Sequence, residues 1–309
     1  MNSRVPDVRF EGFVEPWETQ KLCEIADVFD GTHQTPRYTD SGVMFLSVEN
    51  IETLQSSKFI SLEDFLDGFK ITPKFGDVLM TRIGDIGTTN VVRTNKNLAY
   101  YVSLALLKPK EADSDFLATV MQTSAVKTDI WERTLHVAFP KKINLGEVKN
   151  IVLCSPDKVE QTAIGNFFRS LDEAISLEKQ QHDKMVSVKK AMLEKMFPKK
   201  GATVPEIRFE GFTEPWATRQ LDEFVEFYSG LTYSPVNLIE SGGTLILRSS
   251  NVKDGEIINA DNVYVKTDVV NCFNVSFGDV IVVVRNGSRD LIGKHAQIKT
   301  KMENTSRRI

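Results

Sequence analysis

The segment at residues 5–17 occurs a second time at residues 204–216, with ten of thirteen positions identical. Composition alone would give roughly one match in a segment of this length. Shorter matches follow in the same order, and Phe75-Gly-Asp-Val78 returns as Phe277-Gly-Asp-Val280. The chain is therefore an internal duplication, and two related units joined by the intervening sequence are expected.

The composition is that of a globular protein. With 309 residues and 41% hydrophobic content, the chain can bury real cores, and its length favours about two domains. No apolar run approaches the roughly 18 residues of a membrane-spanning helix, and the first residues lack the apolar stretch of a signal peptide. A cytoplasmic location is therefore expected. The three cysteines are never in Cys-x-x-Cys spacing, so neither a disulfide framework nor a zinc site is indicated.

Short apolar runs bounded by Gly, Asn and Asp predict strands and turns in both units. The expected strands are residues 78–83, 91–92, 100–107, 148–153 and 280–284, and residues 115–131 are expected to be helical. The predicted fold class is α+β, with strand-rich domains separated by a long helix of the coiled-coil type.

That long helix is predicted over residues 156–197. Ser155 and Pro156 are expected to supply its N-cap and first-turn proline, and Pro198 ends the pattern. A seam with alternating steps of four and three residues follows the helix, as in a heptad repeat. Its apolar members are Ile164, Phe168, Leu171, Ile175, Met185, Met192 and Met196. The helix would be a rod of roughly 60 Å, and covering its apolar stripe requires a partner helix.

These features divide the chain into four segments. Residues 1–154 form a first unit and residues 155–198 the central helix. Residues 199–203 are a hinge, and residues 204–309 are a partial second unit.

Motifs of catalysis are missing from the sequence. The four histidines form no His-x-x-x-His or His-x-Glu arrangement, no Gly-x-Ser-x-Gly is present, and residues 287–294 lack the spacing of a phosphate loop. The Asn-Pro-Pro-aromatic signature of adenine methyltransferases is also absent. A stand-alone nuclease or methyltransferase is therefore disfavoured.

Charge argues against a protein whose whole surface binds nucleic acid, because the formal net charge is -4. Locally the balance differs, since residues 285–308 hold seven basic groups against two acidic ones. A basic face that meets DNA and a chance clustering of solvated charges explain this equally well.

Polar loops at corresponding places in the two units are the candidate binding sites. Arg, Asn and Gln can bond base edges in bidentate fashion, and Ser, Thr and Lys can hold phosphates. The residues predicted to contact DNA are Thr32, His33, Gln34, Arg37, Arg82, Asp85, Thr88, Asn90, Lys141, Lys142, Thr232, Tyr233, Arg285, Asn286 and Arg289. Ordinary solvated turns would have the same composition, so the residues alone leave both interpretations open.

Several of these segments resemble the specificity subunit of type I restriction-modification systems. Residues 156–175 and 189–198 look like the central conserved helix of that family. The Arg-Phe-x-Gly-Phe-x-x-x-Trp pattern at residues 9–17 and 208–216 is similar to the lead into its target recognition domains, and Phe75-Gly-Asp-Val78 to a framework strand within them.

The resemblance implies that each target recognition domain reads half of a bipartite site in double-stranded DNA. It also implies that antiparallel helices separate the domains and dock methyltransferase subunits. The chain itself would be non-catalytic and without a cofactor. Adenine methylation and ATP-driven cleavage, with S-adenosylmethionine, ATP and magnesium, would belong to the partner modification and restriction subunits.

The chain departs from the family pattern at its end, which matches the middle of the first unit. A truncation within the second target recognition domain is therefore expected. On this hypothesis residues 1–198 are the functional part, and the rod pairs with another copy of the chain. The alternative is a truncated assembly protein that binds methyltransferase through its helix and reads no DNA.

Overall fold

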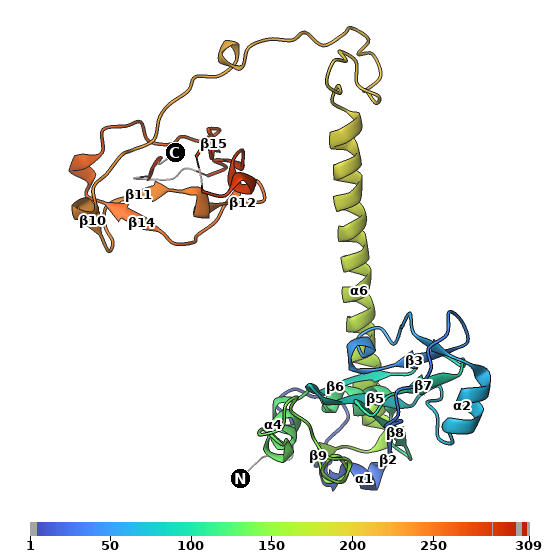
Figure 1. Ribbon diagram of the computed structural model, residues 1–309. Helices are drawn as coiled ribbons and strands as arrows, with labels where there is room; N and C mark the ends of the chain where they lie inside the picture. Colours follow the sequence, from blue (N-terminus) through green and yellow to red (C-terminus); the bar gives the residue numbers. More distant parts are fainter. Residues whose placement is uncertain (1–4, 286, 301–304, 308–309) are drawn as a thin grey trace. The chain divides into compact units, whose positions relative to one another are not determined.

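The structure is a computed structural model that describes residues 5–285, 287–300 and 305–307. The chain divides into two compact units, Met1–Ala191 and Met192–Ile309 (Figure 1). The predicted fold class is confirmed, because strand-rich units accompany one long helix, α6 (Lys158–Lys195). Within the described ranges, no helix combines the length and the apolar composition that a membrane crossing requires.

The described strands of the first unit form three sheets, in the orders β1-β9, β4-β3-β7 and β2-β8-β5-β6. The strands are β1 (Glu18–Lys21), β2 (Ala26–Asp30), β3 (Val43–Leu46), β4 (Phe59–Ile60), β5 (Val78–Ile83), β6 (Asp85–Val91), β7 (Leu98–Tyr100), β8 (Leu104–Pro109) and β9 (Val152–Ser155). The helices before α6 are α1 (Leu22–Ile25), the 3₁₀ turn Val48–Asn50, α2 (Leu62–Gly68), α3 (Ser114–Val120), α4 (Ser124–Arg133) and α5 (Leu145–Lys149).

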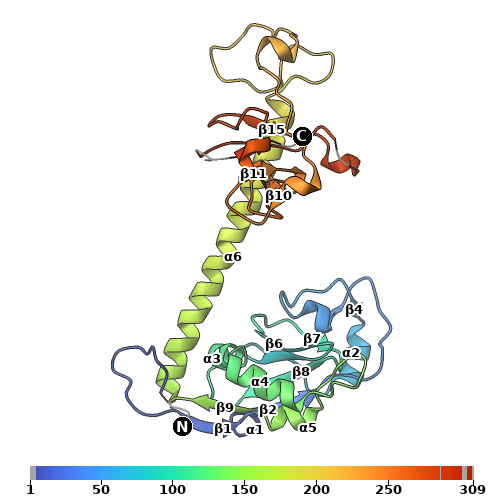
Figure 2. The same cartoon turned by 90° about the vertical axis from the view of Figure 1, so that its left-hand side faces the viewer.

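The antiparallel sheet β2-β8-β5-β6 is the centre of the first unit, with α3, α4 and α5 gathered against one face (Figure 2). Successive residues of a strand point to opposite faces. In β5, Val78 and Met80 accordingly pack with those helices, whereas Leu79 packs with Leu46 and Tyr100 on the other face. β5 and β8 are apolar throughout most of their length because both of their faces are covered.

The predicted strand over residues 78–83 is confirmed. Two longer elements were predicted as continuous, and this is wrong, because each is divided into two. Residues 100–107 are divided between β7 and β8 by a turn in which Leu104 N donates to Tyr101 O at 2.9 Å. The helix expected over residues 115–131 is interrupted at Thr123, which precedes α4. Apolar periodicity continues across both breaks, so the pattern alone did not locate them.

Two further boundaries differ from the prediction. Val148 lies in α5 rather than in the returning strand, which begins only at Val152. Asp157, and not Ser155, caps α6, because Asp157 Oδ1 accepts from the backbone N–H groups two and three residues later at 2.8 and 3.0 Å. Ser155 instead ends β9, where it pairs with Glu18 of β1.

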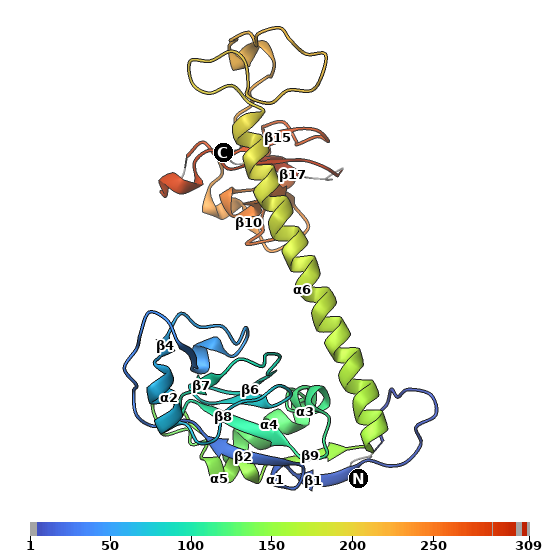
Figure 3. The same ribbon diagram turned by 90° about the vertical axis from the view of Figure 1, so that its right-hand side faces the viewer.

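The first turns of α6 pack closely against the start of α3 (Figure 3). Gln161 Oε1 accepts from the Asp113 N–H at 3.0 Å, and Asp113 in turn caps α3. Gly165 is buried at this contact. A Cβ at Gly165 would lie 2.5 Å from Asp113 Oδ1 and 2.8 Å from Phe116 N, so only glycine permits this approach of the two helices.

The first copy of the repeated segment also fastens to the base of α6. Arg9 Nε and Nη2 donate to the two carboxylate oxygens of Glu160, both at 2.6 Å, and Nη2 donates to the Glu15 carbonyl at 2.6 Å. Glu160 is fully buried. The hydrogen bond to Glu160 raises the pKa of Arg9, against the opposing effect of burial. Phe10 packs edge-on against Phe167, with ring centroids 5.8 Å apart.

The second unit has its own core, and its described strands are short. They are β10 (Leu238–Ile239), β11 (Thr244–Leu247), β12 (Val252–Lys253), β13 (Glu256–Ile257), β14 (Val263–Val265), β15 (Val280–Val282), β16 (His295–Gln297) and β17 (Thr305–Arg307). Single 3₁₀ turns cover Leu221–Glu223, Pro235–Asn237, Ser249–Asn251, Thr267–Val269 and Arg289–Leu291. β15 is shorter than the predicted strand over residues 280–284.

The sequence repeat is also a structural repeat. β11 lies between the antiparallel β14 and the parallel β17, as β3 lies between β4 and β7. In the repeated Phe-Gly-Asp-Val motif, Asp77 and Asp279 each accept the backbone N–H three residues earlier, at 2.7 and 2.9 Å. Gly76 and Gly278 have φ of 88° and 90°, a conformation that favours glycine.

Replacement of Gly165 by alanine is expected to destabilise the first unit. Alanine favours a helix by about 1 kcal/mol over glycine, but overpacking at a closed contact costs about 1–3 kcal/mol, and the nearest backbone atom cannot move aside easily. Urea denaturation of the full chain should show a lower midpoint for Gly165→Ala.

Gly146→Ala in α5 is the matched control, because nothing lies within 4 Å of a Cβ at Gly146. This substitution should leave stability unchanged or raise it by up to about 1 kcal/mol. Equal stabilisation by both substitutions would contradict the close contact of α6 with α3.

Candidate nucleic-acid interface

The polar loops singled out in the first unit emerge at one end of the central sheet. β2 ends at Asp30 and β5 ends at Ile83, both near the first residues of β8. The β5–β6 hairpin turns at the same end, through Gly84. The sheet register therefore brings residues 31–37 close to the hairpin within residues 81–90.

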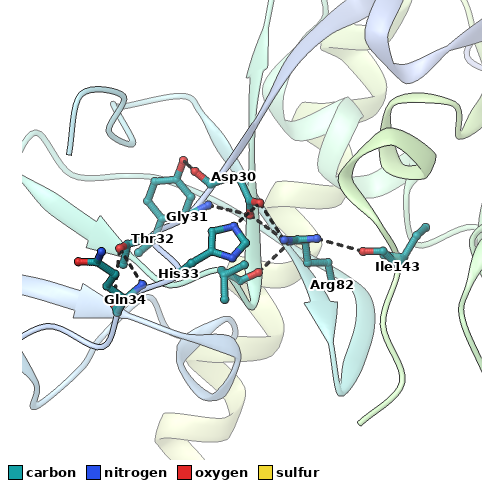
Figure 4. A network of polar contacts seen from close by, with 9 residues as sticks. Asp30, Gly31, Thr32, His33, Gln34, Arg82 and Ile143 are labelled. Atoms are coloured by element: carbon teal, nitrogen blue, oxygen red, sulfur yellow. Dashed lines mark hydrogen bonds and ion pairs between the residues drawn. The ribbon is translucent and has the colours of Figure 1, made fainter. Parts of the chain in front are cut away.

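The Arg82 side chain links these loops to the segment before α5 (Figure 4). Its Nη2 donates to both carboxylate oxygens of Asp30, at 2.8 and 3.0 Å. Nε donates to the Val102 carbonyl at 2.8 Å, and Nη1 donates to the Ile143 carbonyl at 3.2 Å. Only 6% of Arg82 is exposed. The guanidinium therefore donates its hydrogen bonds to groups of its own chain and links three loops.

Asp30 also orients His33, which stands exposed beside the pair of Arg82 and Asp30 (Figure 4). His33 Nε2 donates to Asp30 Oδ2 at 2.9 Å, and 71% of the His33 side chain is exposed. The Tyr100 hydroxyl donates to the Asp30 carbonyl at 2.8 Å, and burial raises the pKa of this hydroxyl. His33 can therefore offer its other ring nitrogen to a ligand without losing its support.

The loop that carries His33 is held through its backbone. Thr32 N donates to Tyr100 O at 3.1 Å, and Thr32 O accepts from Val102 N at 2.9 Å. A Cβ at Gly31 would lie 2.4 Å from the Tyr101 carbonyl oxygen, so glycine permits this close approach. With its start anchored in this way, the loop presents its next side chains to solvent.

The β5–β6 hairpin supplies both anchoring and exposed residues. Thr81 Oγ1 donates to Asp85 Oδ2 at 3.2 Å and accepts the Thr88 N–H at 2.9 Å. Asp85 is exposed and Thr88 is half-buried. The Asn90 amide donates to two carbonyls of the turn after β3, both at 2.9 Å. Asn90, like Arg82, therefore donates its hydrogen bonds to groups of its own chain.

Lys141 and Lys142 lie on the segment between α4 and α5, beside the hairpin. The Lys141 carbonyl accepts the Gly84 N–H at 2.8 Å, and Lys142 pairs with Ile83 through an isolated bridge. Both lysine side chains are exposed. Two positive charges therefore stand beside the turn of the hairpin.

The predicted residues of the first unit thus fall into two groups. The exposed ones are His33, Gln34, Arg37, Asp85, Lys141 and Lys142, and those half-buried or engaged are Thr32, Arg82, Thr88 and Asn90. Sequence reasoning missed Asp30, on which both Arg82 and His33 depend. An acid before a turn glycine carries no sign that it will pair with an arginine 52 positions later.

The predicted residues of the second unit lie on two of its loops. Thr232, Arg285 and Arg289 are exposed, and Tyr233 is half-buried against the cluster of Leu231, Ile246 and Val265. Asn286 lies outside the described residues. A hollow of about 380 Å³ is lined by residues 248–250 and 281–285, so Arg285 borders it.

The predicted seam of α6 is covered at its base and exposed along its length. Ile164 is half-buried against the core of the first unit. Residues 166–190 are exposed throughout. The seam residues in this stretch, between 42% and 64% exposed, are Phe168, Leu171, Ile175 and Met185. Met192 and Met196, towards the end of the pattern, are half-buried.

Comparison with known proteins identifies a family. Residues 14–185, more than half of the chain, match the family model of the type I restriction modification DNA specificity domain. The specificity subunit of the type I restriction enzyme MjaVIII from Methanocaldococcus jannaschii is 22% identical over 191 residues, which cover 58% of this chain and 45% of that subunit. The chain therefore spans less than half of the length of this relative.

Solved structures give a likeness of fold. The S subunit of a type I restriction-modification system from M. genitalium has a TM-score of 0.53 and 16% identity, covering 99% of this chain and 73% of that chain. The HsdS subunit from Thermoanaerobacter tengcongensis has a TM-score of 0.40 and 18% identity, covering 55% and 41%.

Removing the Arg82 guanidinium is expected to destabilise the first unit by about 3 kcal/mol, because it leaves two carbonyls without their donor and the Asp30 carboxylate without its cation. Urea denaturation of Arg82→Ala should show this loss. Arg37→Ala, which truncates an exposed arginine of the neighbouring loop, should change stability by less than about 0.5 kcal/mol. Equal effects of the two substitutions would refute the linking role of Arg82.

Proposed function

The chain belongs to the family of type I restriction modification DNA specificity domains, and we propose that it is the DNA specificity subunit of such a system. In this role it directs partner methyltransferase and restriction subunits to a bipartite site in double-stranded DNA. It carries out no bond chemistry itself. The observation that carries the proposal, in a member of this family, is the convergence of exposed polar loops at one end of the first unit's sheet.

The proposed reading surface consists of His33, Gln34, Arg37, Lys141 and Lys142. Different residue types have different roles on this surface. His33, Gln34 and Arg37 are assigned to base edges, because imidazole, amide and guanidinium groups can bond bases directionally. Lys141 and Lys142 are assigned to phosphates, where a flexible point charge suffices. Arg82 and Asn90 are reassigned from base contact to positioning, since their donors are occupied within the chain.

The domain division is part of the same proposal. Residues 1–154 are the first target recognition domain, residues 155–198 the spacer helix, residues 199–203 a hinge and residues 204–309 part of a second recognition domain. α6 has 38 residues and is about 57 Å long. This length is somewhat under two turns of B-DNA, at about 34–36 Å each, and suits a spacer between two half-sites.

The exposed seam of α6 supports association through this helix. An apolar stripe in water is stabilised when a second helix covers it. We propose that the occupant is α6 of a second copy of the chain, with methyltransferase docked on the pair. Methylation and cleavage, with S-adenosylmethionine, ATP and magnesium, stay with the partner subunits. The assembly would act in the cytoplasm, together with the DNA.

The lysine pair provides a test of DNA contact. Duplexes of roughly 40 base pairs, about four helical turns, would be selected by the full chain from a random pool. With the selected duplex, Lys141→Ala combined with Lys142→Ala should weaken binding and reduce the slope of log K against log salt by about 1.8, or about 0.9 per phosphate contact. Fluorescence anisotropy across a salt series measures both quantities.

Lys74→Ala combined with Lys96→Ala is the matched control, because these exposed lysines lie near the start of β5 and after the end of β6, away from the hairpin turn. The control pair should leave the slope unchanged. Failure of the chain to select any duplex would refute DNA reading, and equal slopes for the two pairs would refute only the assigned surface.

The helix seam provides a test of association. Leu171→Glu places a charge on the seam and should abolish self-association at micromolar concentration, as measured by light scattering after size-exclusion chromatography. Leu177→Glu is the matched control, because Leu177 is 54% exposed and Leu171 43% exposed, but Leu177 lies off the seam. A wild-type chain that is monomeric alone and with methyltransferase would contradict the pairing.

A further inference from the structure

The segment between α4 and α5 presents an apolar tip to solvent. Val137 and Phe139 are 99% and 103% exposed, the highest values among the large apolar residues described as exposed. Leu135 at the start of the tip is 39% exposed. Fully exposed aromatic side chains are unfavourable in water unless a partner covers them. We call residues 135–142 the tip. Its uncovered apolar side chains indicate a surface that a binding partner covers.

The tip is held in place at its base. Leu135 N donates to Lys142 O at 2.8 Å, which closes the segment into a loop. The His136 ring packs on the Trp131 ring with centroids 4.1 Å apart, and His136 Nε2 lies 2.9 Å from the Trp131 carbonyl oxygen. Lys141 Nζ lies 4.6 Å from the centroid of the same Trp131 ring. The apolar residues are thus presented on a supported loop.

The helices on either side of the tip are joined by a network of charges. Arg133 Nε and Nη2 donate to the two oxygens of Asp129, at 2.8 and 3.0 Å, and Nη1 donates to Glu147 Oε2 at 3.1 Å. Asp129 Oδ2 also accepts the Val152 N–H at 3.0 Å. These hydrogen bonds hold α4, α5 and β9 together, and the tip extends from the end of α4.

The tip adjoins the proposed reading surface. Its last residues pair with the β5–β6 hairpin, since Lys141 O accepts the Gly84 N–H at 2.8 Å. Ile143, immediately after the tip, exchanges hydrogen bonds with Arg82, which also holds Asp30 and so supports His33. The exposed cations Lys141 and Lys142 are the last two residues of the tip, directly after its apolar part. The cations can bind the phosphates of a nucleic acid, and the uncovered aromatic ring beside them can stack on its bases.

We propose that Phe139, supported by Val137, inserts between stacked base pairs of the bound DNA duplex while the two lysines hold the adjacent phosphates. This inference rests on the proposed DNA-reading function and adds a mode of binding to it. Apolar side chains that enter a base step unstack it and bend the duplex, and the cost depends on the sequence of that step. Phe139 therefore contributes to sequence choice without a hydrogen bond to any base.

A duplex labelled with 2-aminopurine tests the insertion directly. The label replaces each adenine in turn in the duplex selected by the full chain, and its fluorescence rises when its stacking is lost. Wild-type chain should raise the fluorescence at one step. Phe139→Ala should abolish that rise and weaken binding roughly 10-fold or more, whereas Phe139→Leu should retain part of both effects.

Phe75→Ala is the matched control, because Phe75 is 58% exposed and precedes β5, at the end opposite the hairpin turn. It should leave affinity and fluorescence as in the wild type. If the chain selects no duplex, the proposed function fails and the insertion fails with it. If Phe139→Ala binds and unstacks the selected duplex like the wild type, the insertion alone is wrong. Loss of methyltransferase binding or of self-association in Phe139→Ala, with DNA binding intact, would assign the tip to a protein partner and overturn the proposal.

Discussion

The ion pair between the buried Arg82 and the half-buried Asp30 is the interaction on which the candidate interface depends. A guanidinium has five N–H donors in a rigid plane, so one side chain can join several loops at once. In this chain it joins the end of β2, the turn before β8 and the segment before α5. Loops held in this way can present side chains to a ligand with little ordering cost on binding.

The central helix α6 likewise has one part that is held by the first unit and another part that is exposed. The base of α6 is held by Glu160, which receives Arg9, and by Gly165, which permits close contact with α3. Beyond that contact, residues 166–190 are exposed with their apolar seam uncovered. The first repeated segment thus fastens the helix to the first unit and leaves the rest of the helix exposed. In the second copy, Arg208 again donates to the carbonyl six residues later, in Glu214, at 2.7 Å.

Polar residue types in a loop do not reveal their role by themselves. Arg82 and Asn90 have the chemistry of base readers, yet both bond carbonyls of their own unit. His33 and Lys141 have similar polarity and remain exposed. Apolar residues show the opposite ambiguity, since Phe116 is buried while Phe139 is fully exposed. A structure separates these cases because burial depends on which segments meet in space.

The sequence by itself determined the duplication, the α+β class, the long helix and the absence of catalytic motifs. These follow from local signals, such as the Phe-Gly-Asp-Val turn and the spacing from Phe168 to Met185, which depend only on neighbours along the chain. Only the tertiary structure decided that Asp30 meets Arg82, that Gly165 is a close contact, and that Phe139 stands exposed at the tip. Pairings across many residues depend on sheet register and on the packing of helices against the sheet, and local periodicity contains no record of either.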